Sequence, residues 1–150
     1  MNRILPEYRL NNAMSTSPSE RVRQLLPENP HAYIVDDSVP TRRIFRMILE
    51  ELGFTVNEAV NGKLALEGLK DIISKTDVIF SDISMPQMDG FEFCFRLMQE
   101  PWYDGTPFIL VSTESDAKNV IKGLKLGADD FLPKPFDKEI VAQVLLRILQ

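Results

Sequence analysis

Short apolar runs alternate with segments of helical periodicity from about His31 to the end of the chain. The runs typical of strands are residues 32–35, 54–59, 78–80, 108–111 and 131–132, and the second has the weakest burial signal. Between and after these runs, apolar residues recur at the three- and four-residue spacing of amphipathic helices. Five strands alternating with five helices are typical of a parallel sheet covered by helices on both faces. The pattern therefore predicts an α/β fold.

Each helical segment has a predicted core face. The faces are Ile44, Met47, Ile48 and Leu52 in residues 41–52; Ala65, Leu69, Ile72 and Ile73 in 63–74; Phe91, Cys94, Phe95 and Met98 in 91–98; Val120, Ile121 and Leu124 in 116–126; and Ile140, Val141, Val144, Leu145 and Ile148 in the last segment. Asp116 and Asp137 are predicted N-caps, and Gly53 and Gly127 are predicted to end helices.

Residues 1–30 break this alternation. They contain four prolines and many polar residues, so most of the segment is predicted to be mobile. One part is more specific, because Ser17 followed by Pro18 and Glu20 matches a capping box. This motif predicts a short amphipathic helix over residues 18–26 that needs a surface to pack on. Its apolar face consists of Val22, Leu25 and Leu26. The alternative is a frayed leader.

Composition narrows the class of protein. The chain has 150 residues, of which 44% are apolar and 26% charged, as in an ordinary soluble globular domain. Its formal net charge of −5 does not favour direct binding to nucleic acid or to an anionic membrane. No apolar stretch approaches the ~18 residues of a membrane span. No continuous apolar segment follows Arg3, so a signal peptide is not expected. The single cysteine, Cys94, cannot form an internal disulfide, which fits a reducing cytoplasm. We therefore expect a cytoplasmic protein.

Polar residues follow four of the predicted strands. In chain order these are Asp36-Asp37, Asp82, Ser112-Thr113 and Lys134-Pro135-Phe136. In a parallel sheet these strand ends share one edge, where open α/β sheets bind their ligands. Three carboxylates that lie close together raise one another's pKa or require a cation. A hard divalent cation with oxygen ligands meets that need, so the sequence predicts Mg²⁺, with Mn²⁺ as the alternative.

Asp82 is the predicted phosphoryl acceptor, because it follows a central apolar run and a carboxylate can act as the nucleophile in phosphoryl transfer. Lys134 would place a compact cation beside the phosphoryl oxygens, or beside Asp82 before transfer. Ser112 would donate its hydroxyl to a phosphoryl oxygen. Pro135 makes a cis peptide bond after Lys134 plausible. The plainer alternatives are an Asp-Asp helix cap and turn, a surface lysine and an ordinary hydroxyl at a strand end.

Taken together and in order, these motifs resemble the receiver domain of bacterial two-component response regulators. The motifs are Asp36-Asp37, the run D-I-S-M-P-Q-M-D-G around Asp82, Ser112, and the run G-A-D-D-F-L-P-K-P-F at residues 127–136. The resemblance covers residues 31–150 and sets residues 1–30 apart as an N-terminal extension. It implies a doubly wound, flavodoxin-like (CheY-like) sheet of five parallel strands in the order 2-1-3-4-5, with helices on both faces.

The resemblance also implies a metal-assisted phosphotransfer site. Asp82 would receive a phosphoryl group from a histidine kinase or a histidine phosphotransfer protein. Mg²⁺ would be held by Asp37, Asp82 and the main-chain carbonyl of Ser84, with Asp36 acting largely through water. In the family, the places of Ser84 and Glu114 influence how long the phosphate survives, because they control attacking water.

Ser112 and Phe131 would form the family's switch pair, in which the hydroxyl moves to the phosphoryl group and the ring turns inward. Three features depart from the usual pattern. The switch hydroxyl is a serine where threonine is commoner, and Thr113 follows as a rival hydroxyl that strand alternation points the other way. Phe131 lacks a tyrosine hydroxyl, so the switch would rest on packing. Pro133 has no N–H and fits only an edge strand.

Two surfaces are predicted to meet partners. The resemblance implies an output or homodimer surface on the helix near residues 116–126, the last strand and the last helix. This surface includes the basic residues Lys118, Lys122 and Lys125 and the apolar residues Leu146 and Leu149, which lie beyond the core stripe of the last helix. Arg42, Arg43 and Arg46 lie where a phosphodonor would approach. The alternatives are solvated lysines, and arginines that only offset nearby acids.

These observations predict a phospho-accepting signalling switch that catalyses only its own phosphotransfer and dephosphorylation. The rival enzyme is an aspartyl-phosphate phosphohydrolase, but those enzymes resemble D-x-D, and Ser84 stands where the second Asp is needed. A scaffold that accepts no phosphate is a third hypothesis, which the intact set of acids, hydroxyl and lysine disfavours. The partner that responds to this switch would be a downstream protein or an output domain.

Overall fold

Five parallel strands form one sheet in the order β2-β1-β3-β4-β5. The structure is a computed structural model that describes residues 17–113 and 117–150, without the side chains of residues 117 and 118. The strands are β1 (His31–Val35), β2 (Thr55–Ala59), β3 (Val78–Asp82), β4 (Phe108–Ser112) and β5 (Asp130–Pro133). This order confirms the predicted doubly wound, flavodoxin-like fold.

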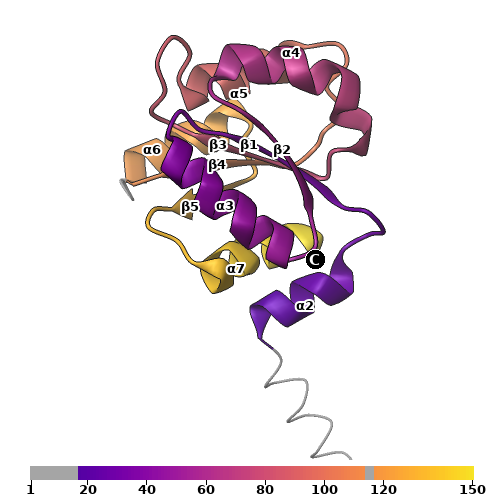
Figure 1. Ribbon diagram of the computed structural model, residues 1–150. Helices are drawn as coiled ribbons and strands as arrows, with labels where there is room; N and C mark the ends of the chain where they lie inside the picture. The colour runs from indigo at the N-terminus through magenta and orange to yellow at the C-terminus, as the bar shows by residue number, and fades with distance from the viewer. Residues whose placement is uncertain (1–16, 114–116) are drawn as a thin grey trace, which may run out of the picture.

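Helices cover both faces of the sheet, as Figure 1 shows. The helices are α2 (Pro18–Leu25), α3 (Val39–Glu51), α4 (Gly62–Ile72), α5 (Gly90–Gln99), α6 (Ala117–Leu126) and α7 (Lys138–Leu149), with a short 3-10 turn, η1 (Ile73–Lys75), after α4. One buried cluster lies between the sheet and α3 and α7, and a second lies between the sheet and α4 and α5. The predicted alternation of strands and helices is therefore present.

Side-chain caps begin most of these helices. Ser38, Asn61, Asp89 and Asp137 each accept a hydrogen bond from the amide three residues later. The predicted cap Asp116 lies outside the described residues, as do Glu114 and residues 1–16 of the N-terminal segment (1–30) that is expected to be mostly mobile. Gly53 and Gly127 follow α3 and α6 with φ of +112° and +114°, so both helices end in the left-handed conformation that glycine adopts without strain.

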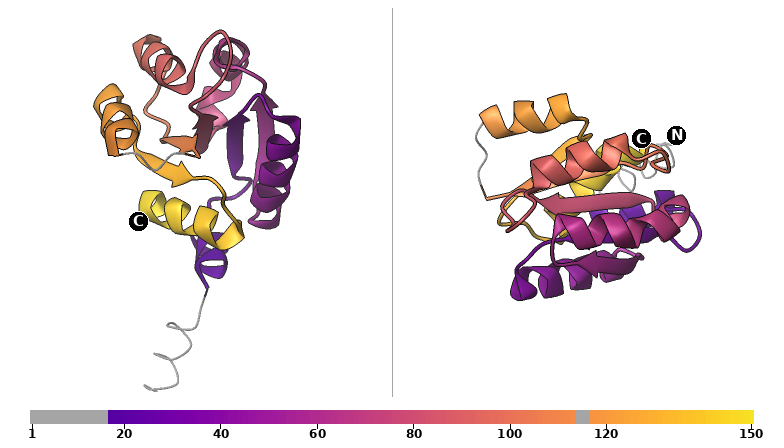
Figure 2. Two further views of the ribbon diagram at one scale, coloured as in Figure 1. Left: turned by 90° about the vertical axis from the view of Figure 1, so that its left-hand side faces the viewer. Right: turned by 90° about the horizontal axis from the view of Figure 1, so that it is seen from above.

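The helix that the capping box predicts is present as α2, with Leu26 as its C-cap, and it packs on the outer side of α7 (Figure 2). Val22 is fully buried and Leu26 is partly buried in the cluster that α3 and α7 share, whereas Leu25 is 47% exposed, contrary to the predicted face. The amide of Ser19 donates to Glu139 Oε1 of α7 at 3.2 Å. Leu25 faces water because only one side of this two-turn helix meets the protein.

The α2 contact also changes the expectation for the end of α7. Leu146 is only 7% exposed and belongs to the same buried cluster as Val22, and Leu149 packs against that cluster. Arg23 of α2 donates from Nε and Nη2 to the main-chain oxygen of Glu51 at 3.2 and 2.9 Å, which ties α2 to the end of α3. The apolar surface that the sequence left open on α7 is therefore covered within the same chain.

The predicted core faces of α3 and α5 are partly wrong. In α3, Ile44 and Met47 are more than half exposed, and the inward side is formed by Phe45, Leu49 and Leu52. Phe45 faces inward because its ring packs against the rings of Phe80 in β3 and of Phe136, with centres 4.8 and 4.6 Å away.

In α5, Phe93 is fully buried, whereas the predicted core residue Phe95 is 51% exposed. The ring of Phe93 packs 5.4 Å from that of Phe108 in β4. Like α3, this helix carries apolar residues on more than one side, so residue spacing alone does not decide which of them faces the sheet.

The predicted core stripe of α6 is partly wrong, because Ile121 and Leu124 are 52% and 49% exposed, whereas Val120 is half-buried. The inward side carries Gly123, where a Cβ atom would collide with the side chain of Leu110 in β4. Because glycine brings the helix close to the strand at this point, the larger residues on either side turn toward solvent. Among the described residues, no helix is long and apolar enough to cross a membrane.

Candidate functional site

The four predicted chemical groups meet at the carboxyl edge of the sheet. Asp36 directly follows β1, Asp82 ends β3, Ser112 ends β4 and Lys134 directly follows β5. The parallel register places Asp82 beside Val111 and Ser112 beside Pro133 in neighbouring strands. The side chains therefore reach one small volume although they are far apart in the sequence.

Three carboxylates form the centre of this site. Asp36, Asp37 and Asp82 each offer one oxygen, and these oxygens lie within 4.8 Å of one another. Asp36 and Asp82 are buried, whereas Asp37 is exposed. Hard oxygen ligands at this spacing, with one side open to water, suit a divalent cation that keeps several of its waters. The donor set therefore fits Mg²⁺ or Mn²⁺.

Lys134 bridges two of the acids. Its Nζ lies 3.1 Å from Asp36 Oδ2 and 3.3 Å from Asp82 Oδ1. Burial alone would lower the pKa of Lys134, but the hydrogen bond that its ammonium donates to Asp36 and the charge of Asp82 raise it. The ammonium is therefore held in its charged form between two carboxylates, where it partly replaces the cation that three acids require.

Asp82 has the opposite electrostatic balance. Burial raises the pKa of Asp82, and the charge of Asp36 raises it further, while the charge of Lys134 acts in the other direction without cancelling them. The carboxylate is thus held in a place where its charge is unfavourable. A group that adds positive charge at the site would stabilise the ionised form.

The loop after β3 packs closely against the main chain of Asp82. Gly90 begins α5, and a Cβ atom there would collide with the main-chain oxygen of Asp82. The amide of Gly90 donates to the carbonyl of Ile83 at 2.7 Å and closes the loop. Ser84, the predicted carbonyl ligand, lies exposed within it, two residues after Asp82. The close approach to the strand therefore requires glycine at position 90.

Lys134 reaches the acids from the turn that follows β5. Its amide donates to the carbonyl of Ser112 at 2.8 Å, and its peptide bond to Pro135 is cis, as the sequence made plausible. Pro133 lies in β5, which is an edge strand, as its missing N–H requires. From this turn the Lys134 side chain reaches the strand ends, where its Nζ meets Asp36 and Asp82.

The two predicted hydroxyls differ in burial. Ser112 is 7% exposed at the end of β4, whereas Thr113 is exposed. The predicted switch residue Phe131 is partly buried in β5 and packs against the cluster that α4 and α5 cover. Ser112 is thus the hydroxyl enclosed at the acid edge, and Phe131 is neither fully buried nor fully exposed.

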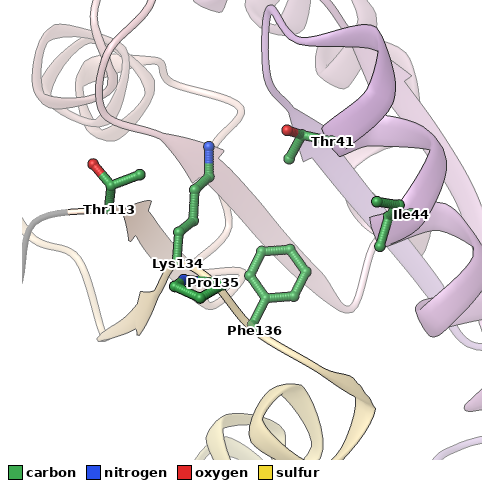
Figure 3. Close-up of a pocket in the computed structure, with 6 residues that line it drawn as sticks. All are labelled: Thr41, Ile44, Thr113, Lys134, Pro135 and Phe136. Carbon is green, nitrogen blue, oxygen red and sulfur yellow. The ribbon is translucent and has the colours of Figure 1, made fainter.

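A pocket of about 320 Å³ opens beside Lys134. Its lining consists of Thr41, Ile44, Thr113, Lys134, Pro135 and Phe136. Figure 3 shows Thr41 and Ile44 on α3 facing the Lys134–Phe136 segment, with the lysine amine at the upper end of the pocket. The walls are mainly apolar, so the acid site has a hydrophobic surface on its α3 side.

The sequence interpretation missed one part of the site. The sequence predicts for Arg42 only a docking role or an offset for nearby acids, but its Nη1 donates to the main-chain oxygen of Asp36 at 2.6 Å. Its Nε pairs with Glu58 of β2 at 2.7 Å. The available signal was a lone acid in the edge strand β2, where Glu58 lies beside Ile34 of β1.

Comparisons with known proteins identify a family that the chain resembles over most of its length. A family model described as the response regulator receiver domain matches residues 32–146. Protein PilG of Pseudomonas aeruginosa is 34% identical over 106 residues, which cover 71% of this chain and 77% of PilG. The transcriptional regulatory protein ResD of Bacillus subtilis is 34% identical over 112 residues, which cover 74% of this chain but only 45% of ResD. The chain thus spans less than half of that regulator.

Solved structures show the same fold. The chemotaxis protein CheY4 of Vibrio cholerae has a TM-score of 0.75 and 32% identity, and the match covers 80% of this chain and 98% of that chain. The CheY of the CheX–CheY–BeF3–Mg²⁺ complex from Borrelia burgdorferi has a TM-score of 0.76 and 29% identity, covering 81% of this chain and 90% of that chain. Both matches span nearly the whole of the similar protein.

Proposed function

The chain belongs to the family of response regulator receiver domains, and from that premise we propose that Asp82 is its phosphoryl acceptor. Membership makes it a phospho-accepting receiver of a two-component system. The observation that supports Asp82 is the position of Lys134 Nζ, 3.3 Å from Asp82 Oδ1 and 3.1 Å from Asp36 Oδ2. Asp82 is the acid at the end of a central strand and in contact with the lysine.

In the proposed reaction, an oxygen of Asp82 forms a bond to phosphorus while the bond from phosphorus to the donor's imidazole nitrogen breaks. The electron pair of the broken bond stays on that nitrogen. Lys134 is within reach of the new phosphoryl oxygens because its ammonium already lies beside Asp82. Ser112 donates its hydroxyl to another phosphoryl oxygen from the end of β4.

Asp37, Asp82 and the main-chain carbonyl of Ser84 would hold the Mg²⁺, or Mn²⁺ in its place, with Asp36 acting largely through water. A bound Mg²⁺ neutralises charge on the transferring phosphoryl group. The spacing of the three carboxylates supports this set, as does the presence of Mg²⁺ in the complex of the similar Borrelia CheY. Asp36 has fewer oxygens to offer, because its carboxylate already accepts from Lys134 and from the amide of Ser38.

The phosphodonor, a histidine kinase or a histidine phosphotransfer protein, would dock on the outer side of α3. Three apolar side chains there are more than half exposed, namely Val39, Ile44 and Met47. Ile44 also lines the pocket that leads to Lys134, so this face is continuous with the acid site. Arg43 is exposed on the same helix and adds positive charge. A partner helix with an apolar stripe would reach Asp82 from this side.

The output surface would lie on α6, β5 and α7, and it would serve a downstream protein, an attached output domain or a second copy of the chain. Ile121 and Leu124 of α6 are half exposed beside Lys122 and Lys125, whose charges favour an acidic partner. Phosphorylation would draw Ser112 toward the phosphoryl group and let the partly buried Phe131 turn inward. The protein turns over no separate substrate in this proposal.

Incubation with acetyl phosphate and Mg²⁺, followed by intact-protein mass spectrometry, tests the proposal. The wild-type protein should gain one phosphoryl group and Asp82→Asn should gain none. Asp89→Asn is the matched control, because Asp89 is an exposed acid whose role is to cap α5 and asparagine also caps helices. Phosphorylation of Asp82→Asn, or no phosphorylation of the wild type, would contradict the assignment.

A further inference from the structure

The main chain of Asp36 is fixed on both sides. Its amide donates to the carbonyl of Ala59 in β2 at 3.2 Å, and its carbonyl accepts from Arg42 Nη1 at 2.6 Å. That carbonyl belongs to the peptide plane that joins Asp36 to Asp37. Because a peptide unit is planar, a bond to its oxygen also sets the direction in which Asp37 leaves the strand.

Arg42 is itself held by Glu58. The guanidinium Nε lies 2.7 Å from Glu58 Oε1, and the arginine side chain is only 11% exposed. Arg46 pairs with the other oxygen of Glu58 at 2.6 Å. Burial alone would raise the pKa of Glu58, but the hydrogen bonds and charges of Arg42 and Arg46 lower it, so the carboxylate stays ionised. The ionised carboxylate of Glu58 therefore holds the guanidinium of Arg42 in one orientation.

We propose that Arg42 is a positioning residue for the divalent cation, acting through the Asp36–Asp37 peptide. This inference rests on the proposed function of the acid site. Arg42 uses one nitrogen on Glu58 and another on the Asp36 carbonyl, so it links the edge strand β2 to the loop that carries two of the acids. The side chain of Asp37 is exposed. Arg42 therefore acts on Asp37 through the preceding peptide, whose oxygen it binds.

The direction in which metal affinity changes when Arg42 is removed distinguishes a positioning role from a purely electrostatic one. Arg42 is a cation near a cation site, so its removal should strengthen metal binding if long-range repulsion were its main effect. Loss of positioning should weaken binding instead. Groups that orient metal ligands from outside the coordination shell typically change metal affinity by about 10- to 100-fold.

The test is a titration with Mn²⁺ alone, in which electron paramagnetic resonance measures the free ion. Arg42→Ala should bind Mn²⁺ at least about 10-fold more weakly than the wild type. Arg46→Ala is the matched control, because Arg46 pairs with Glu58 and Glu50, and none of its described contacts is to Asp36. Its affinity should fall by much less than the roughly 10-fold loss expected for Arg42→Ala. Equal or tighter binding by Arg42→Ala, or an equal loss in both variants, would overturn the inference.

A second measurement does not depend on the metal. Hydrogen exchange at the amides of Asp37 and Ser38 in metal-free protein should be faster in Arg42→Ala than in Arg46→Ala. Arg42→Lys serves if the alanine variant does not fold, since a point charge can pair with Glu58 but lacks the second arm of the fork; it should also weaken Mn²⁺ binding. A wild type that binds no Mn²⁺ would refute the proposed function, whereas unchanged exchange in the variants refutes the role of Arg42.

Discussion

The acid site and the contact between α2 and α7 are built in opposite ways. At the acid site, Asp36 and Asp82 are buried side by side, and burial and the charge of Asp36 make the ionised form of Asp82 unfavourable, with Lys134 as partial compensation. At the other contact, Val22 is buried among apolar side chains and α2 begins with a complete capping box. One region holds charges ready for a reaction, and the other contributes stability without chemistry.

This contrast teaches where each property of the molecule comes from. Full burial of a valine contributes about 1.5–3 kcal/mol, which is a large share of the stability of a small domain. Clustered carboxylates reduce stability unless a cation joins them. The extension before β1 thus stabilises a fold whose reactive edge is unfavourable, and the two regions can be changed separately.

The largest effect is expected from Val22→Asp. A carboxylate at this buried position would release α2 from α7 and lower the free energy of unfolding by about 3 kcal/mol. Urea denaturation would measure the loss. Phosphorylation by acetyl phosphate should persist, because α2 makes no contact with the acid site among the described interactions.

Gln24→Asp is the control for that change, since Gln24 is exposed on the same helix. It should alter the free energy of unfolding by less than about 0.5 kcal/mol. If Val22→Asp were as stable as Gln24→Asp, α2 would not contribute to the folded core.

A smaller effect of opposite sign is expected from Asp82→Asn. The pKa of Asp82 is raised in the folded protein by burial and by Asp36, so its ionised form opposes folding above that pKa. In the absence of metal, the neutral amide should increase the free energy of unfolding at pH 7 by an amount on the order of 1 kcal/mol. The gain should shrink as the pH falls toward the ordinary aspartate pKa, where the wild-type carboxyl is also neutral.

Thermal denaturation over a pH series, without and with Mg²⁺, would measure this difference. Mg²⁺ should stabilise the wild type more than Asp82→Asn, because the variant lacks one proposed ligand. A variant that is less stable than the wild type at every pH would mean that the pairing of Asp82 with Lys134 outweighs burial and repulsion.

The smallest effect is expected from Leu124→Ala on α6. Leu124 is half exposed, so its truncation should change the free energy of unfolding by less than about 0.5 kcal/mol in the isolated protein. Leu146→Ala on α7 is the buried comparison and should cost about 2 kcal/mol, because Leu146 lies in the same buried cluster as Val22. Equal losses in urea denaturation would show that the two helices are covered to the same extent.

The sequence predicted the strands and the composition of the acid edge, because apolar runs that end in polar residues fix where parallel strands finish. The prediction of the inward side failed in helices where apolar residues occur on more than one side. Phe45 instead of Ile44, Phe93 instead of Phe95, and Gly123 instead of Leu124 face the sheet. The choice depends on which side chain fits the strand beneath, and spacing along one helix does not contain that information.

The sequence indicated the separate members of tertiary contacts but not which members meet. The sequence indicated a short helix that needs a surface and, separately, an apolar end of α7 that needs a cover, but it did not join Val22 to the cluster of Leu146. Likewise, Arg42 and Glu58 meet only because β2 lies beside β1. Such contacts depend on how elements are placed in space, which local patterns do not specify.

The docking of α2 also separates two boundaries that are often treated as one. The family match begins at residue 32 and ends at residue 146, whereas the packed core includes Val22 and Leu149. A gene fragment cut to the family match would encode Asp36, Asp82 and Lys134 but not the helix that packs on α7. Homology therefore marks out the shared chemistry of this chain, while its packed core extends beyond the family match at both ends.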